Sequence, residues 1–190
     1  GRNLTSGFCD LPGAAVPAEE IDLGRLPAGS YTVTVASAPT VDSIVIEEGN
    51  LTFNNSSLTL TGTTPSIDVA SGLTATFNTK LLGSNGLVKT GTGTLLLAST
   101  GNNYTGDTSV SAGTLQVGTG ASILPTATAV AVSSGATFEI LAGSGTQRIA
   151  SLAGAGTVNL NDSLLRTGDA SDTTFSGAFA GTVLKGRLAS

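Results

Sequence analysis

The 190-residue chain contains no histidine, no tryptophan, no methionine and a single cysteine, Cys9. Without histidine it lacks the usual general base and the commonest metal ligand of proteins, so neither a histidine-dependent triad nor a cysteine–histidine pair can form. A lone cysteine allows no intrachain disulfide and no structural zinc site. We therefore expect no catalytic, cofactor-binding or metal-binding residues, and no cofactor. Cys9 is expected to be a buried or incidental thiol, with an intermolecular disulfide or a lipid attachment as the alternatives.

Charge is scarce as well. Charged residues make up 11% of the chain, the formal net charge is −5, and the eight lysines and arginines are scattered singly. Because no basic stripe could follow a phosphate backbone, nucleic acid is not an expected partner. No apolar run approaches the roughly 20 residues that span a bilayer, and residues 1–10 lack the layout of a signal peptide. We expect any membrane attachment to run through an anchor or barrel outside this sequence.

Glycine is abundant and introduces a repeated pattern. Six segments open with glycine and continue with apolar residues at alternate positions, and their starts are separated by roughly 20 to 23 residues, a period typical of solenoid proteins. The six starts are Gly49, Gly72, Gly93, Gly113, Gly135 and Gly156. Further runs with the period-two alternation of strands lie between them, at residues 58–60, 66–69, 108–110, 130–132 and 148–152. Each repeat therefore holds two or three short strands, and helices should be nearly absent.

Strand-only repeats of this length predict an all-β fold, a right-handed parallel β-helix in which each repeat forms one coil and equivalent strands stack about 4.8 Å apart. Inward positions should line up as one apolar stack, whose members are Phe53, Phe77, Leu97, Val117, Ile140 and Leu160. Outward positions carry threonine, asparagine and serine. The glycines should occupy corners with positive φ, or positions where a side chain would meet the neighbouring coil. In this register Val117→Asp is strongly destabilising and Gln116→Asp is nearly silent.

Residues 1–30 do not follow the repeat. They contain Pro12, Pro17 and Pro27, which predict an irregular segment before the first strand at 31–35. Because a β-helix exposes unpaired strands at its ends, we assign residues 1–30 as an N-terminal capping segment and residues 31–190 as the parallel β-helix. The C-terminal residues show no equivalent cap, so we expect that the native chain continues or that another subunit covers that edge.

Residues 86–118 contain a longer motif. The pattern G-L-x-K-x-G-x-G-T-L occupies residues 86–95, N-x-Y-x-G-x-T occupies residues 102–108, and A-G-T-L occupies residues 112–115. Together they resemble the passenger-associated repeat of bacterial autotransporters, and weaker matches extend the likeness over most of residues 30–183. The resemblance implies a right-handed β-helical, extracellular segment of a large surface protein of a Gram-negative bacterium. Such proteins carry a C-terminal membrane barrel that this sequence lacks, so we expect either a separated passenger or a stand-alone secreted relative.

A few residues could carry chemistry. A glycosidase needs two carboxyl groups set several Å apart across a groove, and the candidates are Asp169 with Asp172, or Asp162 near Arg166. The sequence favours a solvated loop for these residues. The glycine-rich stretches 91–93 and 143–145 precede no helix and are expected to be turns rather than phosphate loops. Threonine-rich runs resemble the ladders of ice-binding β-helices, but the Thr-x-Thr pair drifts between repeats, so outward threonines of ordinary strands explain them better.

We therefore expect a non-enzymatic β-helix at the extracellular or cell surface of a Gram-negative bacterium, acting as an adhesive scaffold or structural rod. Its partners would be host or neighbouring cell-surface or matrix components. One alternative is a self-assembling fibre or matrix subunit that associates through exposed coil ends. Another is a polysaccharide-active enzyme on the same fold.

Overall fold

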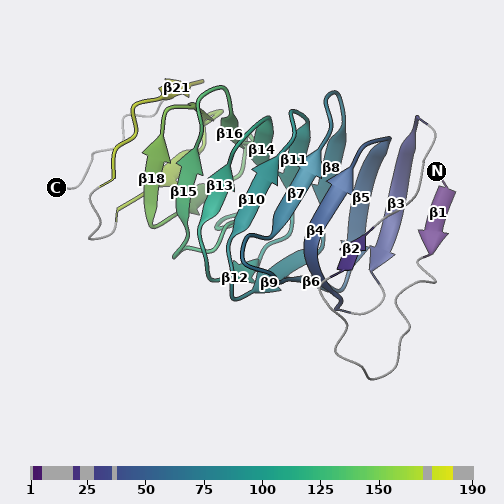
Figure 1. The fold of residues 1–190 in the computed structure, drawn as a ribbon. Coiled ribbons are helices and arrows are strands. Elements are labelled where there is room, and N and C mark those ends of the chain that lie inside the picture. The colour runs from purple at the N-terminus through teal and green to yellow at the C-terminus, as the bar shows by residue number, and fades with distance from the viewer. Residues whose placement is uncertain (1, 6–18, 22–27, 36–37, 169–172, 182–190) are drawn as a thin grey trace.

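The computed structural model describes residues 2–5, 19–21, 28–35, 38–168 and 173–181, with side chains described from residue 28 onwards. These residues form 21 short strands that stack as a parallel β-solenoid of about seven turns (Figure 1). No helix occurs in the described ranges, and so none there is long and apolar enough to cross a membrane. The predicted all-β, parallel solenoid is confirmed.

Each full coil has three sides, which we call faces 1, 2 and 3. Face 1 is a nine-stranded sheet formed by β1 (Arg2–Thr5), β3 (Ser30–Val35), β5 (Asn50–Asn55), β8 (Thr74–Phe77), β11 (Thr94–Leu97), β14 (Thr114–Val117), β16 (Thr137–Ile140), β19 (Thr157–Asn159) and β21 (Ala178–Ala180). Face 2 consists of β6 (Ser57–Leu60), β9 (Lys80–Gly83), β12 (Asn103–Tyr104), β17 (Thr146–Arg148) and β20 (Leu164–Arg166). Face 3 consists of β7 (Ser66–Val69), β10 (Leu87–Thr90), β13 (Thr108–Val110), β15 (Ala129–Val132) and β18 (Ser151–Gly154).

One long strand joins faces 2 and 3. Strand β4 (Thr40–Ile46) pairs with β6 through its first residues and with β7 through its last four. In the next coil, two separate strands, β6 on face 2 and β7 on face 3, pair with the single strand β4. Strand β2 (Glu19–Ile21) lies along β4.

The predicted apolar stack lies on the inner side of face 1. Backbone pairing aligns Phe53, Phe77, Leu97, Val117 and Ile140 in that order, and each is at most 1% exposed. Leu160 is buried as well. The rings of Phe53 and Phe77 stack with their centroids 4.4 Å apart. Burying side chains of this size stabilises a fold by about 1.5–3 kcal/mol each, so the stack is a main source of stability.

Two glycines illustrate the two roles predicted for this residue. Gly72 has φ +76°, and a Cβ placed there would meet nothing within 4 Å. Gly93 has no positive φ, but its Cβ would lie 2.2 Å from the backbone oxygen of Ala70 in the preceding coil. The backbone conformation therefore favours glycine at position 72, whereas the close approach of two coils requires it at position 93.

The run 148–152, predicted as one strand, is two strands in the structure. Strand β17 ends at Arg148 and pairs with β20, whereas β18 begins at Ser151 and pairs with β15. The chain turns a corner of the solenoid between them, and Ile149 at this corner is buried. Because the corner residue also points into the core, the alternation of apolar residues continues through it and does not reveal the turn.

The N-terminal segment contains two short strands where the sequence predicted irregular structure. Strand β1 pairs with β3 and β2 pairs with β4, both in parallel. Strands of four and three residues are too short for the alternation to mark them. The other residues up to 27, including Cys9, lie outside the described part of the chain. The capping role of residues 1–30 stays a prediction.

A column of threonines runs along the outer side of face 1. Backbone pairing aligns Thr74, Thr94, Thr114, Thr137 and Thr157. The second threonine of a Thr-x-Thr pair does not repeat from coil to coil. Two residues after each threonine of the column stand, in order, Thr76, Leu96, Gln116, Glu139 and Asn159. The absence of a Thr-x-Thr ladder on this face is confirmed, and the single column was missed because the segments between repeats differ in length.

Candidate functional site

Lys89 is the lysine of the passenger-repeat motif, and it occupies an inward position of β10 where it is fully buried. Its ammonium group donates hydrogen bonds to the carbonyl oxygens of Thr90, Gly91 (2.7 Å) and Ala112 (3.3 Å). All three ammonium donors therefore have partners, and the bond to Ala112 ties one coil to the next. Burial lowers the pKa of Lys89 to about 8, an effect that the nearby Asp68 carboxylate partly opposes.

Tyr104 and Thr108, two polar residues of the second part of the motif, meet inside the solenoid. The hydroxyl groups of Tyr104 and Thr108 are 2.7 Å apart, and Thr108 lies 3.0 Å from the hydroxyl of Thr128 in the following coil. Thr128 donates in turn to the carbonyl of Gly106. All three hydroxyl residues are buried, and burial raises the pKa of Tyr104 well above its ordinary value. The network joins two coils and leaves no hydroxyl exposed for chemistry.

One coil has no strand on face 2. Side-chain amides there form the hydrogen bonds to neighbouring coils that backbone groups form elsewhere. The Oδ1 of Asn102 accepts from the backbone N–H of Leu81 at 2.8 Å, and its Nδ2 donates to the carbonyl of Ile123 at 2.9 Å. The N–H of Ile123 donates to the Oε1 of Gln147 at 2.8 Å. Residues 118–128 are thus held between two coils by the buried amides of Asn102 and Gln147.

This irregular loop and β12 enclose a shallow concavity of about 290 Å³ on face 2. Its lining is entirely uncharged and includes Asn103, Ser122, Pro125 and Thr126. The side chains of Asn103, Ser122 and Thr126 form no hydrogen bond in the described part of the chain. Ser122 also adopts a left-handed backbone conformation, with φ +54°. Unused amide and hydroxyl groups beside a proline ring offer hydrogen bonds and apolar contact to a neutral ligand.

The carboxylate of Glu139 forms the centre of a polar network on face 1. Gln116 Nε2 donates to its Oε2 at 2.7 Å, while Asn161 Nδ2 and Asn159 Nδ2 donate to its Oε1 at 2.8 and 3.2 Å. Three amide donors, one from the preceding coil and two from the following coil, therefore hold this carboxylate. The arrangement fixes the outer surface of face 1 rather than presenting a free acid or base.

The residues considered for polysaccharide cleavage do not form a site. Asp162 lies in the turn before β20 and Arg166 at the end of that strand, and the two form no ion pair with each other. Asp169 and Asp172 lie outside the described residues. Within the described ranges, no group of three or more acidic, cysteine or histidine residues could hold a metal ion.

The glycine-rich stretches predicted to be turns are turns. Gly91 has φ +67° at the corner after β10, and Gly143 and Gly145 have φ +76° and +66° before β17. Each stretch leads into a strand, so neither offers the helix N-terminus of a phosphate loop.

Comparison with known proteins agrees with the motif. Residues 87–117 match the family model described as passenger-associated-transport-repeat. The adhesin BmaC autotransporter of Brucella suis biovar 1 (strain 1330) is 37% identical over 105 residues, which are 55% of this chain and 3% of that protein. The chain thus spans a small fraction of this curated relative. No solved structure matches the chain.

The matched residues coincide with the contacts described above. Lys89, Tyr104 and Thr108 lie within residues 87–117, and each uses its polar group to join neighbouring strands or coils. Lys89, Tyr104 and Thr108 of the motif therefore point inward and hold the strands and coils together. As the resemblance of residues 86–118 predicted, the chain carries an autotransporter passenger-associated repeat, folded as part of a parallel β-solenoid.

Proposed function

We propose that this chain is an adhesin-like segment of a cell-surface autotransporter passenger. It acts as a rigid rod whose outer faces contact host or neighbouring cell-surface or matrix components, outside a Gram-negative cell. The observation that carries the proposal is the passenger repeat. Its residues Lys89, Tyr104 and Thr108 use their polar groups in hydrogen bonds between strands and coils. The name of the relative, an adhesin autotransporter, supports the same assignment.

The proposal includes a non-enzymatic role. Its support is chemical. The sequence has no histidine, and three amide groups hold the Glu139 carboxylate. Asp162 and Arg166 form no ion pair. General acid–base catalysis needs a positioned group with a suitable pKa beside a bound substrate. Weak contacts spread over long, regular outer faces fit adhesion better.

Adhesion is tested by coating beads with the purified chain and counting the beads that remain on cultured epithelial cells after washing. Beads that carry the folded chain should adhere well above uncoated beads. The matched control is the Val117→Asp variant, which should lose the fold because it places a carboxylate in the apolar stack. Equal retention of both kinds of bead, or retention no better than uncoated beads, would refute adhesion by the folded solenoid.

A further inference from the structure

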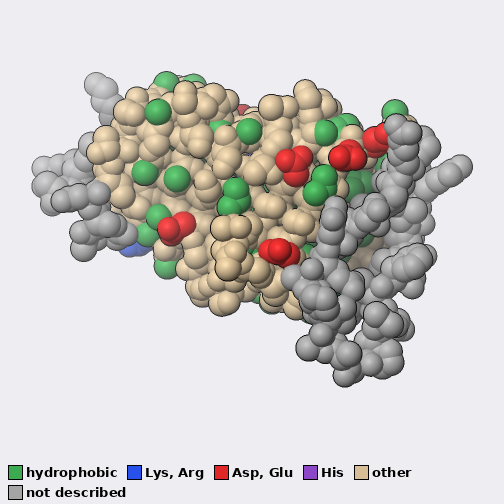
Figure 2. Space-filling view, viewed as in Figure 1, with side chains coloured by type: hydrophobic (Ala, Val, Ile, Leu, Met, Phe, Trp, Pro, Cys, Tyr) green, Lys and Arg blue, Asp and Glu red, His purple; other side chains and the backbone are tan. Residues whose placement is uncertain are grey.

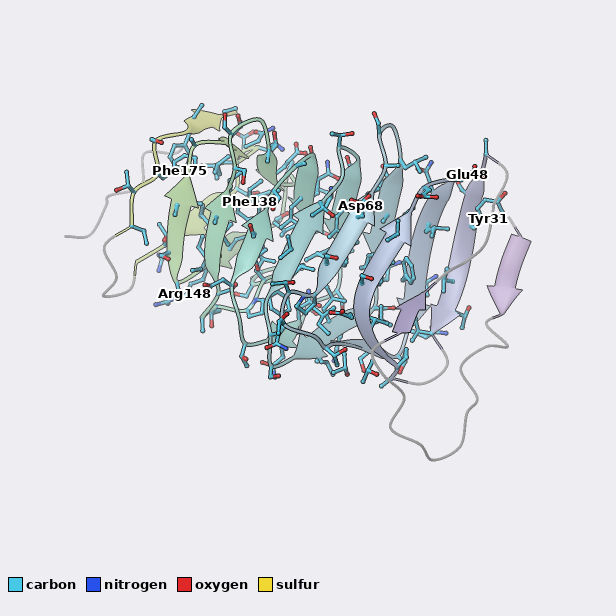
Figure 3. All side chains as sticks on the ribbon, viewed as in Figure 1. Tyr31, Glu48, Asp68, Phe138, Arg148 and Phe175 are labelled. Carbon is cyan, nitrogen blue, oxygen red and sulfur yellow. The ribbon has the colours of Figure 1, made fainter. Side chains whose placement is uncertain are left out.

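Two arginines lie side by side on face 2. Strands β17 and β20 are parallel neighbours, and their backbone register pairs Arg148 with Arg166. Both side chains are exposed. Figure 3 places Arg148 at the lower edge of the solenoid, pointing away from the core. Since neighbouring strands are about 4.8 Å apart, two guanidinium groups project from adjacent positions of the same face.

This pairing is not explained by stability. Like charges directly opposite each other on neighbouring strands repel. Neither guanidinium group has a hydrogen bond or an ion pair in the described part of the chain, and the nearby Asp162 forms no ion pair with Arg166. The whole chain is acidic, with a net charge of −5. In Figure 2 several acidic side chains lie over the front of the solenoid, and one of them lies near the lower left edge, where basic atoms are visible. Face 2 therefore concentrates unpaired positive charge on an acidic protein.

The uncharged concavity lies one coil away from the arginines on the same face. The backbone N–H of Ser122, which lines the concavity, donates to the carbonyl of Thr146 in β17 at 3.3 Å. Arg148 is two residues further along that strand. A molecule lying along face 2 could thus meet the free groups of Asn103, Ser122 and Thr126 at one end and the arginines at the other.

We propose that face 2 binds an acidic polysaccharide, with Arg148 and Arg166 clamping one sulfate or carboxylate group and the concavity receiving a neighbouring sugar ring. Guanidinium groups bind planar or tetrahedral oxyanions through paired N–H donors, which suits this anion. The amide and hydroxyl groups of the concavity match sugar hydroxyls. This inference rests on the proposed adhesive function and names the class of partner for one face.

Other polyanions fit the face less well. Single-stranded nucleic acid is usually held by aromatic side chains on which bases stack, and the concavity is lined by Tyr104, which is buried, and by no other aromatic residue. Anionic membranes bind clusters of about four to eight lysines and arginines, more than the described residues of face 2 supply. A sparse pair of arginines beside neutral hydrogen-bonding groups favours a glycan.

The test measures binding of the purified chain to immobilised heparin, with neutral dextran as the reference surface. The wild-type chain should bind heparin and not dextran. Arg148→Gln combined with Arg166→Gln should weaken binding at least tenfold at low salt and reduce the slope of log affinity against log salt by about two, since each arginine releases about one counterion. The matching Arg→Lys pair keeps the charge but loses the paired donors, so its loss should be intermediate.

A charge-matched control separates the site from net charge. Ser111→Glu combined with Ala131→Glu changes the net charge by the same two units at exposed positions near face 3, and should leave heparin binding within about twofold of the wild type. An equal loss in both double variants would overturn the site. Wild-type binding to single-stranded DNA or to phosphatidylserine vesicles that exceeds binding to heparin would overturn the choice of glycan, and no binding to heparin at all would overturn the proposal.

The bead assay distinguishes this inference from the proposed function. Beads with the Arg→Gln pair that lose heparin binding but still adhere to cells would leave adhesion standing and refute the arginine site as its basis. Wild-type beads that fail to adhere, together with arginine-dependent heparin binding, would refute the adhesive function and keep the site.

Discussion

Val117 tests the register of the solenoid, because it lies in the middle of the apolar stack, paired with Leu97 and Ile140, and is 0% exposed. Replacing it with aspartate forfeits about 1.5–3 kcal/mol of apolar burial. The new carboxyl group must also stay neutral inside the core. A pKa raised by about 3–5 units corresponds to about 4–7 kcal/mol at 1.36 kcal/mol per unit. The sum, roughly 5–10 kcal/mol, is comparable with the whole stability of a typical domain.

The assay is urea unfolding followed by circular dichroism, with hydrogen exchange to locate the coils that open first. Thr114→Asp is the matched control, because Thr114 lies on the outer side of the same strand, and it should cost less than about 1 kcal/mol. Gln116→Asp, expected from the sequence to be silent, is not a neutral control, since it removes the bond to Glu139 and brings two carboxylates together. Equal costs for Val117→Asp and Thr114→Asp would refute the register.

Further tests address Lys89 and the corner glycines. The pKa of Lys89 is about 8 in the folded chain and has its ordinary value of 10.5 in the unfolded chain, so between these pH values the unfolded chain binds the extra proton. The free energy of unfolding of the wild type, relative to that of Lys89→Met, should therefore rise by up to about 3 kcal/mol from pH 8 to 10.5. A flat difference in urea unfolding across this range would contradict the buried ammonium. Gly72→Asn should cost about 1 kcal/mol or less, because asparagine tolerates positive φ better than other side chains do and the space is open. Gly93→Asn should cost at least about 2 kcal/mol, because its side chain would collide with the preceding coil. Similar unfolding midpoints for the two variants would disprove the distinction.

The local pattern of the sequence was sufficient for the repeat and for its inward face. Alternation with period two is set by strand geometry, so the sequence alone assigns Phe53, Phe77 and Val117 to one stack. The glycine at position 93 followed from the same repeat. Such features depend on residues a few positions apart.

Other features depend on how coils of unequal length align. The buried position of Lys89 runs against hydropathy and is possible because carbonyl groups from two coils surround its ammonium group. The strand missing from face 2 and the concavity beside it arise where residues 118–128 interrupt the coil. Arg148 and Arg166 are separated by segments that the sequence does not align. These two charges become neighbours only through the stacking of whole coils, which is a tertiary property. The sequence by itself determined that the chain forms coils that can stack.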